Sequence, residues 1–394
     1  MSSRNSSNDR RDMLEIYQKF QDTCDFKKVG KLLGKGAFGE VRDITFKNNK
    51  TMAGKLVKRE GNEKTEEEKY AVELRNQNII KINKIYSKNI GGENYDLIIM
   101  EKAILRDLGK LNEFYHKHNL LKLIFGPFDE PSGDSLLRFY SRQIINALEA
   151  LNRNYYIHYD LKPENLLITI NLIVKLSDFS LLRKVQNENT KVPGGTQGFL
   201  SPEYYIDRNM SCEDARKQDY FALGSTLFYL KYGCQMLKYK KSDSGEINNF
   251  SVIDLLQKNM AFIKSRKMTD KDFIDFLCSL IQYRPKDRPS FEEIYRNKWL
   301  NKDVDYINNT FNAFENDEEK LIMEFQKKDF LIKKERELNG NSVDNNDNEK
   351  KKNSKLNENG QELKDNLYDD EYTKKNEIKP EKPCRFRFKK KRKF

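Results

Sequence analysis

Two stretches near the middle of the chain, HYDLKPEN at residues 158–165 and SDFS at residues 177–180, carry the side chains with the clearest chemistry. Asp160 can accept a proton from an attacking hydroxyl, and Lys162 can neutralise a phosphoryl group in transfer. Asn165 and Asp178 supply the oxygen atoms that divalent metal ions prefer. Phosphoryl transfer depends mainly on positioning and charge neutralisation, so these residues predict a phosphotransferase site.

Together the two stretches resemble the catalytic and metal-binding loops of the eukaryotic protein kinase family, which read His-Arg-Asp-x-Lys-Pro-x-Asn and Asp-Phe-Gly. The resemblance implies ATP and Mg²⁺ as cofactors, Asp160 as the base, and Asn165 and Asp178 as metal ligands. Tyr159 replaces an arginine that binds a phosphate on the activation segment of many relatives, so we expect activity without that phosphate. Ser180 replaces a glycine, and since serine tolerates positive φ less well, we expect a bias in how the segment flips.

A glycine-rich hairpin is predicted at residues 32–46, LLGKGAFGEVRDITF. A strand-like sequence follows its glycines, Gly34, Gly36 and Gly39, where a dinucleotide-binding fold would begin a helix. Such glycines let backbone amides approach phosphates closely. Lys55 follows in the apolar strand TMAGKLV, and the resemblance implies that it binds the inner phosphates of ATP.

The partner of that lysine is expected on the next helix. Position within the family favours Glu67, while Glu66, Glu68 and Glu73 remain alternatives, because helical periodicity does not separate them.

The resemblance also implies the adenine site. Met100 would gate the pocket behind the adenine, the backbone of Glu101 and Ala103 would bond its edge, and Asp107 would hold the ribose or a basic substrate residue. Four apolar residues would sandwich the ring, although ordinary core packing accounts for them equally well: Leu33, Val41, Ala53 and Leu167.

The stretch GGTQGFLSPEYY, residues 194–205, resembles the end of a kinase activation segment. Thr196 would then bond Asp160 and Lys162, a combination that indicates Ser/Thr specificity. Glu203 would form a buried ion pair with Arg288, and Asp219 would cap the backbone of the catalytic loop.

The fold class implied is α+β, a two-lobed protein kinase fold with a small β-rich lobe and a large helical lobe. A helix is predicted over residues 134–152 with Asp134 as its N-cap. The short amphipathic segment MLEIYQKF, residues 13–20, is expected either to pack on the small lobe or to fray. The expected divisions are an N-terminal extension (1–25), a kinase domain (26–300, with lobes 26–101 and 102–300), a helical extension (301–338) and a disordered basic tail (339–394).

Composition agrees with a partly unfolded, intracellular protein. Hydrophobic residues make up 37% and charged residues 34%, and the region after residue 339 has too few apolar residues to offset chain entropy. No run approaches the roughly 18 apolar residues of a membrane span, and the five cysteines are dispersed as free thiols would be. We expect a cytoplasmic or nuclear location.

The partners expected are protein substrates, with Glu164 and Asp107 pointing to basic residues near the target hydroxyl. The terminal CRFRFKKKRKF is compatible with nuclear import, an anionic membrane, RNA or no partner at all. The final part of the domain, RPSFEEIYRNKWL, resembles the calcium/calmodulin-regulated kinases and their neighbours.

Two alternatives to an active Ser/Thr kinase remain at this point. A pseudokinase scaffold would bind nucleotide and partners without transfer, but Lys55, Asp160, Asn165 and Asp178 are all present. A small-molecule phosphotransferase of kinase-like fold is disfavoured, because Ser-Pro-Glu and Arg288 belong to the peptide-binding architecture.

Overall fold

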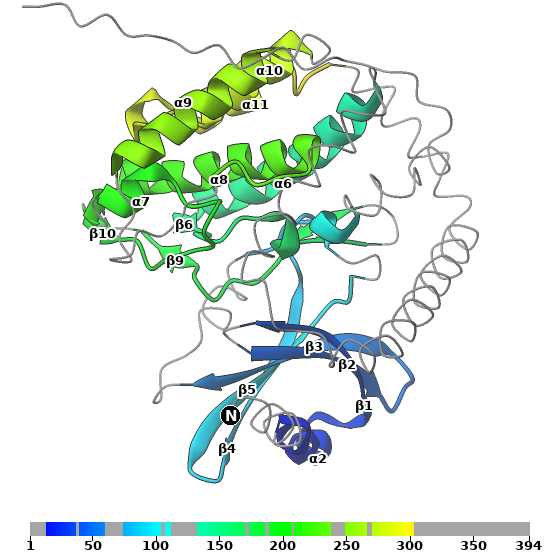
Figure 1. Ribbon diagram of the computed structural model, residues 1–394. Coiled ribbons are helices and arrows are strands. Elements are labelled where there is room, and N and C mark those ends of the chain that lie inside the picture. The colour runs from blue at the N-terminus through cyan, green and yellow to red at the C-terminus, as the bar shows by residue number, and fades with distance from the viewer. Residues whose placement is uncertain are drawn as a thin grey trace, which may run out of the picture. The chain divides into compact units, whose positions relative to one another are not determined.

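The computed structural model (Figure 1) describes ten stretches of the chain, all within the first of two units, Met1–Phe325 and Gln326–Phe394. The described residues are 13–36, 39–59, 74–103, 107–111, 132–169, 173–185, 189–206, 209–237, 249–265 and 270–302. The predicted helical extension beyond residue 302 and the tail therefore lie outside them. Within these stretches no helix is long and apolar enough to cross a membrane.

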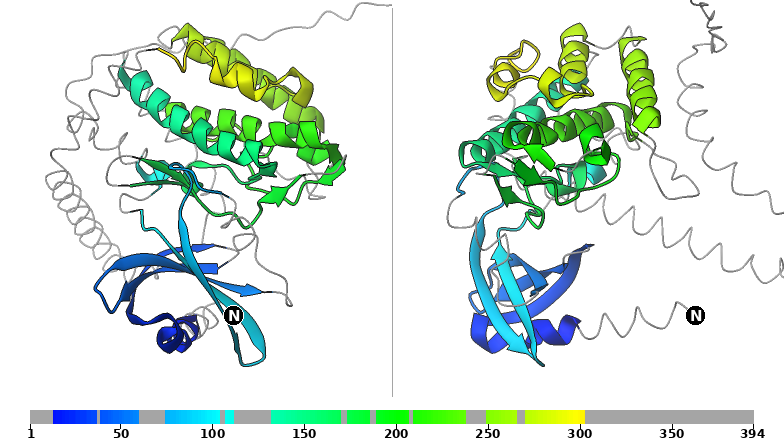
Figure 2. Two further views of the ribbon diagram at one scale, coloured as in Figure 1. Left: turned by 180° about the vertical axis from the view of Figure 1, so that it is seen from behind. Right: turned by 90° about the vertical axis from the view of Figure 1, so that its left-hand side faces the viewer.

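The N-terminal part is a five-stranded antiparallel sheet with the order β1-β2-β3-β5-β4, and its twist is visible from the side in Figure 2. The glycine-rich hairpin and the lysine strand form as expected. Gly91 and Gly92 make the tight β4–β5 turn with φ angles of 63° and 86°, which favour glycine. The strands are β1 (Phe26–Gly36), β2 (Gly39–Phe46), β3 (Thr51–Arg59), β4 (Ile82–Ile90) and β5 (Glu93–Met100).

The N-terminal extension packs against this sheet. Residues 13–19 are helical and α2 (Gln21–Cys24) continues them beside β1 (Figure 1). Tyr17 and Phe20 are fully buried in a cluster with Ile44, Leu56 and other sheet residues. Of the two alternatives for this segment, packing is therefore the one observed, and the ordered part begins before Phe26.

The C-terminal part is helical. In α6 the buried residues Ile144, Ala147, Leu148 and Leu151 form one face, as the sequence periodicity predicts. The N-cap prediction for Asp134 is wrong, because the helix already begins at Ser132. The helices are α6 (Ser132–Arg153), α7 (Pro202–Ile206), α8 (Cys212–Tyr232), α9 (Asn249–Ser265), α10 (Lys271–Leu280) and α11 (Phe291–Tyr295).

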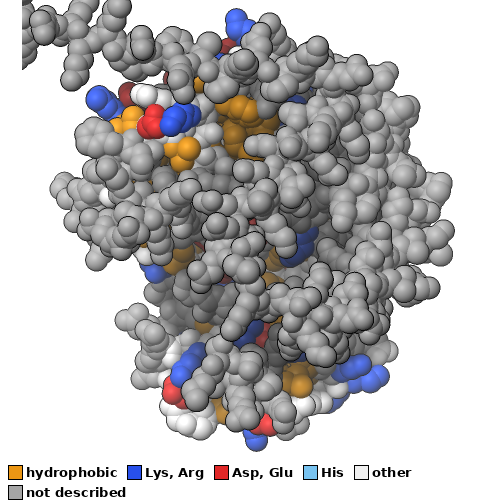
Figure 3. Space-filling view, viewed as in Figure 1, with side chains coloured by type: hydrophobic (Ala, Val, Ile, Leu, Met, Phe, Trp, Pro, Cys, Tyr) orange, Lys and Arg blue, Asp and Glu red, His pale blue; other side chains and the backbone are white. Residues whose placement is uncertain are grey.

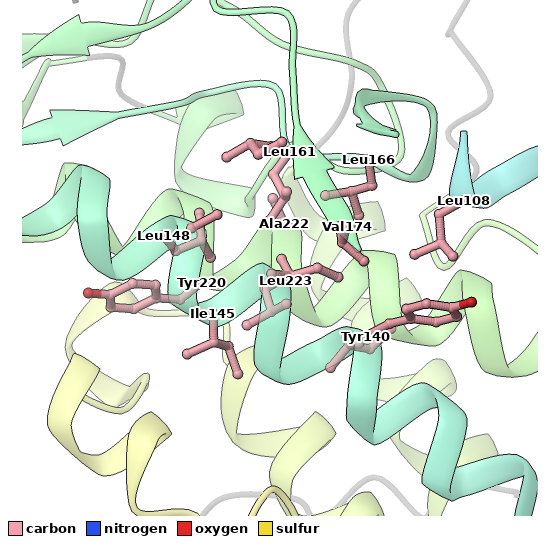
Figure 4. Packing of buried hydrophobic residues seen from close by; sticks show 14 of the residues in the cluster. Leu108, Tyr140, Ile145, Leu148, Leu161, Leu166, Val174, Tyr220, Ala222 and Leu223 are labelled. Atoms are coloured by element: carbon pink, nitrogen blue, oxygen red, sulfur yellow. The ribbon is translucent and has the colours of Figure 1, made fainter. Parts of the chain in front are cut away.

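Helix α8 lies at the centre of this part. Most of its length is buried, which explains why its apolar residues do not keep to one face. The Ser211 hydroxyl caps its first turn by accepting from the Asp214 amide at 3.1 Å, and Gly233 ends it with φ 72°. Figure 4 shows Tyr220, Ala222 and Leu223 of α8 in the same apolar cluster as residues of α6.

Short strands frame the catalytic stretch. The hairpin of β7 (Leu166–Ile168) and β8 (Val174–Leu176) packs into that cluster through Leu166 and Val174 (Figure 4). Two further antiparallel pairs join β6 (Tyr156–Ile157) to β9 (Arg183–Lys184) and β10 (Asn189–Lys191) to β11 (Asn209–Ser211). The 3₁₀ turns are η1 (Pro163–Asn165) and η2 (Pro285–Asp287). The stretch 158–165 is thus held between β6 and β7, and residues 177–182 run from β8 to β9.

Candidate active site

The backbone of the catalytic loop is held in place by hydrogen bonds to a side chain of α8. The carboxylate of Asp219 accepts hydrogen bonds from the amides of His158, at 2.8 Å, and Tyr159, at 3.0 Å. Burial raises the pKa of this carboxyl, and the two amide bonds and His158 oppose that rise. The left-handed φ of Tyr159, 64°, is unusual for an aromatic residue, and the two bonds hold the loop in that conformation.

Asp160 is the hub of the site. Its Oδ1 accepts from the Thr196 hydroxyl at 2.6 Å, and its Oδ2 accepts from Lys162 Nζ at 2.7 Å. Lys162 also donates to the Thr196 oxygen at 2.6 Å, which closes a triangle of three side chains. The Asn165 amide nitrogen donates to Asp160 Oδ2 at 3.1 Å and to its backbone carbonyl at 2.8 Å. Asp160 is therefore fixed in orientation before any substrate arrives.

Lys55 and Asp178, 123 residues apart in sequence, form an ion pair of 2.9 Å. Lys55 is nearly buried, and Asp178 also accepts a bond of 3.0 Å from the Ser180 hydroxyl. Burial alone would raise the pKa of Asp178, but the charge and hydrogen bond of Lys55 and the bond from Ser180 outweigh it and lower the pKa. The carboxylate thus remains charged, as a metal ligand must be.

The donor set suits Mg²⁺. The amide nitrogen of Asn165 is turned toward Asp160, which leaves its carbonyl oxygen as the atom for a metal, and Asp178 has a second carboxylate oxygen beyond the one that Lys55 and Ser180 bind. Both are hard oxygen donors. Among the described residues there is no cluster of three or more His, Cys, Asp or Glu side chains that could hold a metal. Such a sparse set fits an ion whose remaining ligands are phosphate oxygens and water.

Several residues predicted to line the adenine pocket lie on neighbouring strands. Ala53 pairs with Met100 across β3 and β5, and Val41 pairs with Lys55 across β2 and β3. Val41 packs against the main apolar cluster. Leu167 does so too, whereas Leu33 is 37% exposed.

The two acidic residues near this pocket are engaged by neighbours. The Glu101 amide donates to the Lys81 carbonyl at 2.9 Å, so of its backbone groups the carbonyl remains for an adenine. Its carboxylate accepts from the Lys81 amide and pairs with Lys175. Asp107 is buried and bonded to the amide and the ammonium of Lys110, at 2.9 and 2.7 Å. Glu67 and its alternatives lie outside the described residues.

Comparison with known proteins identifies the family. The model of the protein kinase domain matches residues 27–300, which is more than half of the chain. The chain belongs to the protein kinase family. The Aurora kinase of Saccharomyces cerevisiae is 28% identical over 277 residues, or 69% of this chain and 68% of that protein. The Aurora kinase of Schizosaccharomyces pombe is 27% identical over 281 residues, which cover 70% of this chain and 71% of that protein.

A further relative, the Homo sapiens serine/threonine-protein kinase MRCK alpha, is 27% identical over 217 residues, which cover 52% of this chain but 12% of that protein. These relatives are Ser/Thr kinases and support the same activity here, while they give no support for a place near the calcium/calmodulin-regulated group. Protein kinases in general use ATP and Mg²⁺ and act on protein substrates.

The activation segment of this kinase is fastened by the expected ion pair. Arg288 forms a bidentate pair with Glu203, with Nη1 to Oε1 at 2.5 Å and Nη2 to Oε2 at 2.6 Å, and the arginine side chain has no exposed surface. Gln218 of α8 adds a bond to the same carboxylate at 3.3 Å. Gln218 was not expected from the sequence, because an amide on a helix carries no signal of a partner 15 residues away.

Tyr159, at the position of the family's phosphate-binding arginine, is buried in a separate apolar cluster. That cluster includes Val185 and Val192 of the activation segment together with Met210 and Ala215. An apolar contact therefore connects the catalytic loop to the segment at this point.

The conformational bias expected of Ser180 is not explained by backbone strain. Asp178, not Ser180, has the positive φ, 59°. Ser180 instead contributes its hydroxyl to Asp178. The positive φ on which that expectation depends is therefore not found at Ser180 in this conformation, and the bias in flipping stays a prediction.

His158 connects the two loops of the kinase site, a role that its place in the motif could have suggested. Its Nε2 lies 3.1 Å from the Ser177 carbonyl, and its ring contacts Phe179 edge-on with centroids 5.3 Å apart. Its Nδ1 accepts from the Asp160 amide at 3.2 Å. His158 therefore couples the positions of the two loops.

Proposed function

We propose that this kinase transfers the γ-phosphoryl group of ATP, with Mg²⁺, to serine and threonine hydroxyls of proteins. The observation that carries the proposal is the assembled set of Asp160, Lys162 and Thr196 beside the Lys55–Asp178 pair. Asn165 and Asp178 would hold the magnesium ion, which would supply positive charge to offset that of the phosphates. Lys55 would bind the inner phosphates, giving up part of its contact with Asp178.

Asp160 would orient the incoming hydroxyl and take its proton. Both of its oxygens already accept hydrogen bonds, which fixes the plane of the carboxylate. Lys162 lies 2.7 Å from Asp160 and would offset the negative charge of the phosphoryl group as it moves toward the substrate oxygen. The scaffold alternative has no observation in its favour.

We propose further that the activity does not require a phosphate on the activation segment. Tyr159 carries no charge to bind one, and burial with Val185 and Val192 supplies an apolar attachment instead. Each buried apolar side chain of this kind contributes about 1.5–3 kcal/mol, which is more than the roughly 0–1 kcal/mol of an exposed ion pair.

A preference for basic residues near the target hydroxyl is a weaker part of the proposal. Glu164 is exposed in the same loop as Asp160 and is available to a basic peptide. Asp107 no longer supports the idea, since Lys110 already neutralises it. On the face shown in Figure 3, the described Lys and Arg side chains are scattered, and Asp or Glu side chains lie beside some of them.

The test measures ADP release and phosphate transfer to a pool of basic and neutral peptides, with magnesium, for the wild type, Asp160→Asn and the control Asp254→Asn on the exposed face of α9. We expect Asp160→Asn to lose at least about a hundredfold in rate, as loss of a general base does, and the control to be unaffected. Equal rates for the wild type and Asp160→Asn would overturn the proposal. Treatment with a phosphatase should leave the wild-type rate within about twofold, and loss of activity would refute the independence from phosphate.

A further inference from the structure

The N-terminal helical segment, residues 13–24, covers the face of the sheet opposite to the nucleotide site. Strand side chains alternate between faces, so Leu56 lies in the cluster with Tyr17 and Phe20, whereas Ala53 lies in the main cluster. Lys55 points the same way as Ala53 and reaches Asp178. One face of β3 thus packs against the N-terminal segment, and the other presents Lys55 to Asp178.

Tyr17 reaches from this segment onto the backbone between two strands. Its hydroxyl lies 2.6 Å from the Glu40 carbonyl in β2 and 2.9 Å from the Gly54 carbonyl in β3, and the single hydroxyl hydrogen is shared between them. The side chain has no exposed surface. Burial and the nearby Glu40 raise the pKa of Tyr17, so the hydroxyl keeps the proton that it donates.

The contact falls directly behind the residues that face the nucleotide. Glu40 pairs with Leu56 in the ladder, and the next pair is Val41 with Lys55. Glu40 also follows Gly39, the last glycine of the phosphate-covering hairpin. A bond that joins the carbonyls of residues 40 and 54 therefore fixes β2 against β3 where the hairpin and the lysine must keep their spacing.

We propose that Tyr17 is a positioning residue for nucleotide binding, which acts from the far face of the sheet by holding the glycine hairpin and Lys55 in register. The inference rests on the proposed function, because it takes ATP as the ligand of the near face. It also makes the segment before Phe26 part of the catalytic domain.

The test is Tyr17→Phe, which removes the hydroxyl and leaves the ring in place. Its matched control is Tyr86→Phe, since Tyr86 packs on the same cluster from β4. Dissociation constants for MgATP are measured by displacement of a fluorescent nucleotide, and KM and kcat by ADP release. Loss of one hydrogen bond predicts about two- to tenfold weaker ATP binding and a matching rise in KM, with kcat within about twofold of the wild type.

A second readout needs no nucleotide. Amide hydrogen exchange in the free protein should rise at Arg42 and Leu56, the residues that flank the bond on β2 and β3, in Tyr17→Phe and not in Tyr86→Phe. Unchanged ATP affinity and unchanged exchange would overturn the inference while leaving phosphotransfer intact. A fall in melting temperature with unchanged affinity would also overturn it, since that result describes a purely structural tyrosine.

The two proposals fail separately. If the wild type binds MgATP but transfers no phosphate, the proposed function falls and the comparison of dissociation constants still decides the role of Tyr17. If the wild type binds no ATP at all, both are refuted.

Discussion

Removal of either partner of the Glu203–Arg288 pair should be among the most damaging single substitutions outside the catalytic residues. The guanidinium donates two short bonds to Glu203, and it also donates to the carbonyls of Gln282, Lys217 and Tyr283 at 2.9, 3.0 and 3.3 Å. Every polar group in this arrangement is satisfied by another member of it.

The two substitutions are not equivalent. Glu203→Gln keeps the shape and leaves a buried guanidinium with its carbonyl partners, for which we expect a loss of about 3 kcal/mol. Arg288→Met leaves a buried carboxylate and strips three carbonyls of a donor, so we expect about 5 kcal/mol. For a domain of this size these losses correspond to a fall of roughly 6–20 °C in melting temperature. The double variant that combines Arg288→Met with Glu203→Leu should recover part of the lost stability, because it leaves no buried charge.

The assay is urea unfolding followed by the fluorescence of Trp299, the only tryptophan in the chain, which is fully buried against Phe273 and Phe276. The control is Arg296→Met, which breaks an ion pair with Glu292 whose side chains are 75% and 70% exposed and should cost less than about 1 kcal/mol. The reasoning is refuted if Arg288→Met costs no more than this control, or if the double variant is less stable than both single ones.

Two further predictions concern smaller interactions. Ser180→Gly removes the hydroxyl that donates to Asp178, and we expect the magnesium concentration for half-maximal ATP binding to rise about two- to tenfold; an unchanged titration would mean that the hydroxyl does not position the carboxylate. At the end of the domain, Asp270 and Lys302 form an ion pair. Burial by itself would raise the pKa of Asp270, but hydrogen bonds from Lys302 and from a backbone amide lower that pKa below the ordinary 3.8. Hydrogen bonds to Asp272 and Asp270 raise the pKa of Lys302 above the ordinary 10.5. Both charges then stabilise the fold between these values, so Lys302→Ala should lower stability by up to about 1 kcal/mol at neutral pH. The loss should shrink progressively as the pH falls below the ordinary range of an aspartate and Asp270 takes up a proton, as urea titrations over a series of pH values would show.

Much of the catalytic chemistry was readable from the sequence because it resides in short stretches. Asp160, Lys162 and Asn165 occupy one loop, and their order and spacing are specific to phosphoryl transfer, so the resemblance to kinases then predicted the contacts of Thr196 and Asp219. Helical periodicity of apolar residues predicted the buried face of α6, since a pattern of local period depends only on the local backbone.

Other features depended on which surfaces meet. Apolar residues at 13–20 indicated a helix face, but nothing in the sequence specified the strands beneath it or the carbonyls that Tyr17 reaches, 23 and 37 residues away. The same holds for Ser180, whose hydroxyl could have faced solvent, and for Gln218.

The sequence by itself thus determined which residues of this kinase are candidates for proton acceptance, charge neutralisation and metal binding. Tertiary structure decided how those residues are held. The apolar burial of Tyr159 and the hydrogen bonds of Tyr17 to the strand carbonyls behind Lys55 join segments far apart in the chain. Such contacts exist only once packing has brought the two surfaces together. Residue type sets what a side chain can donate or accept, but the partner is chosen by the fold.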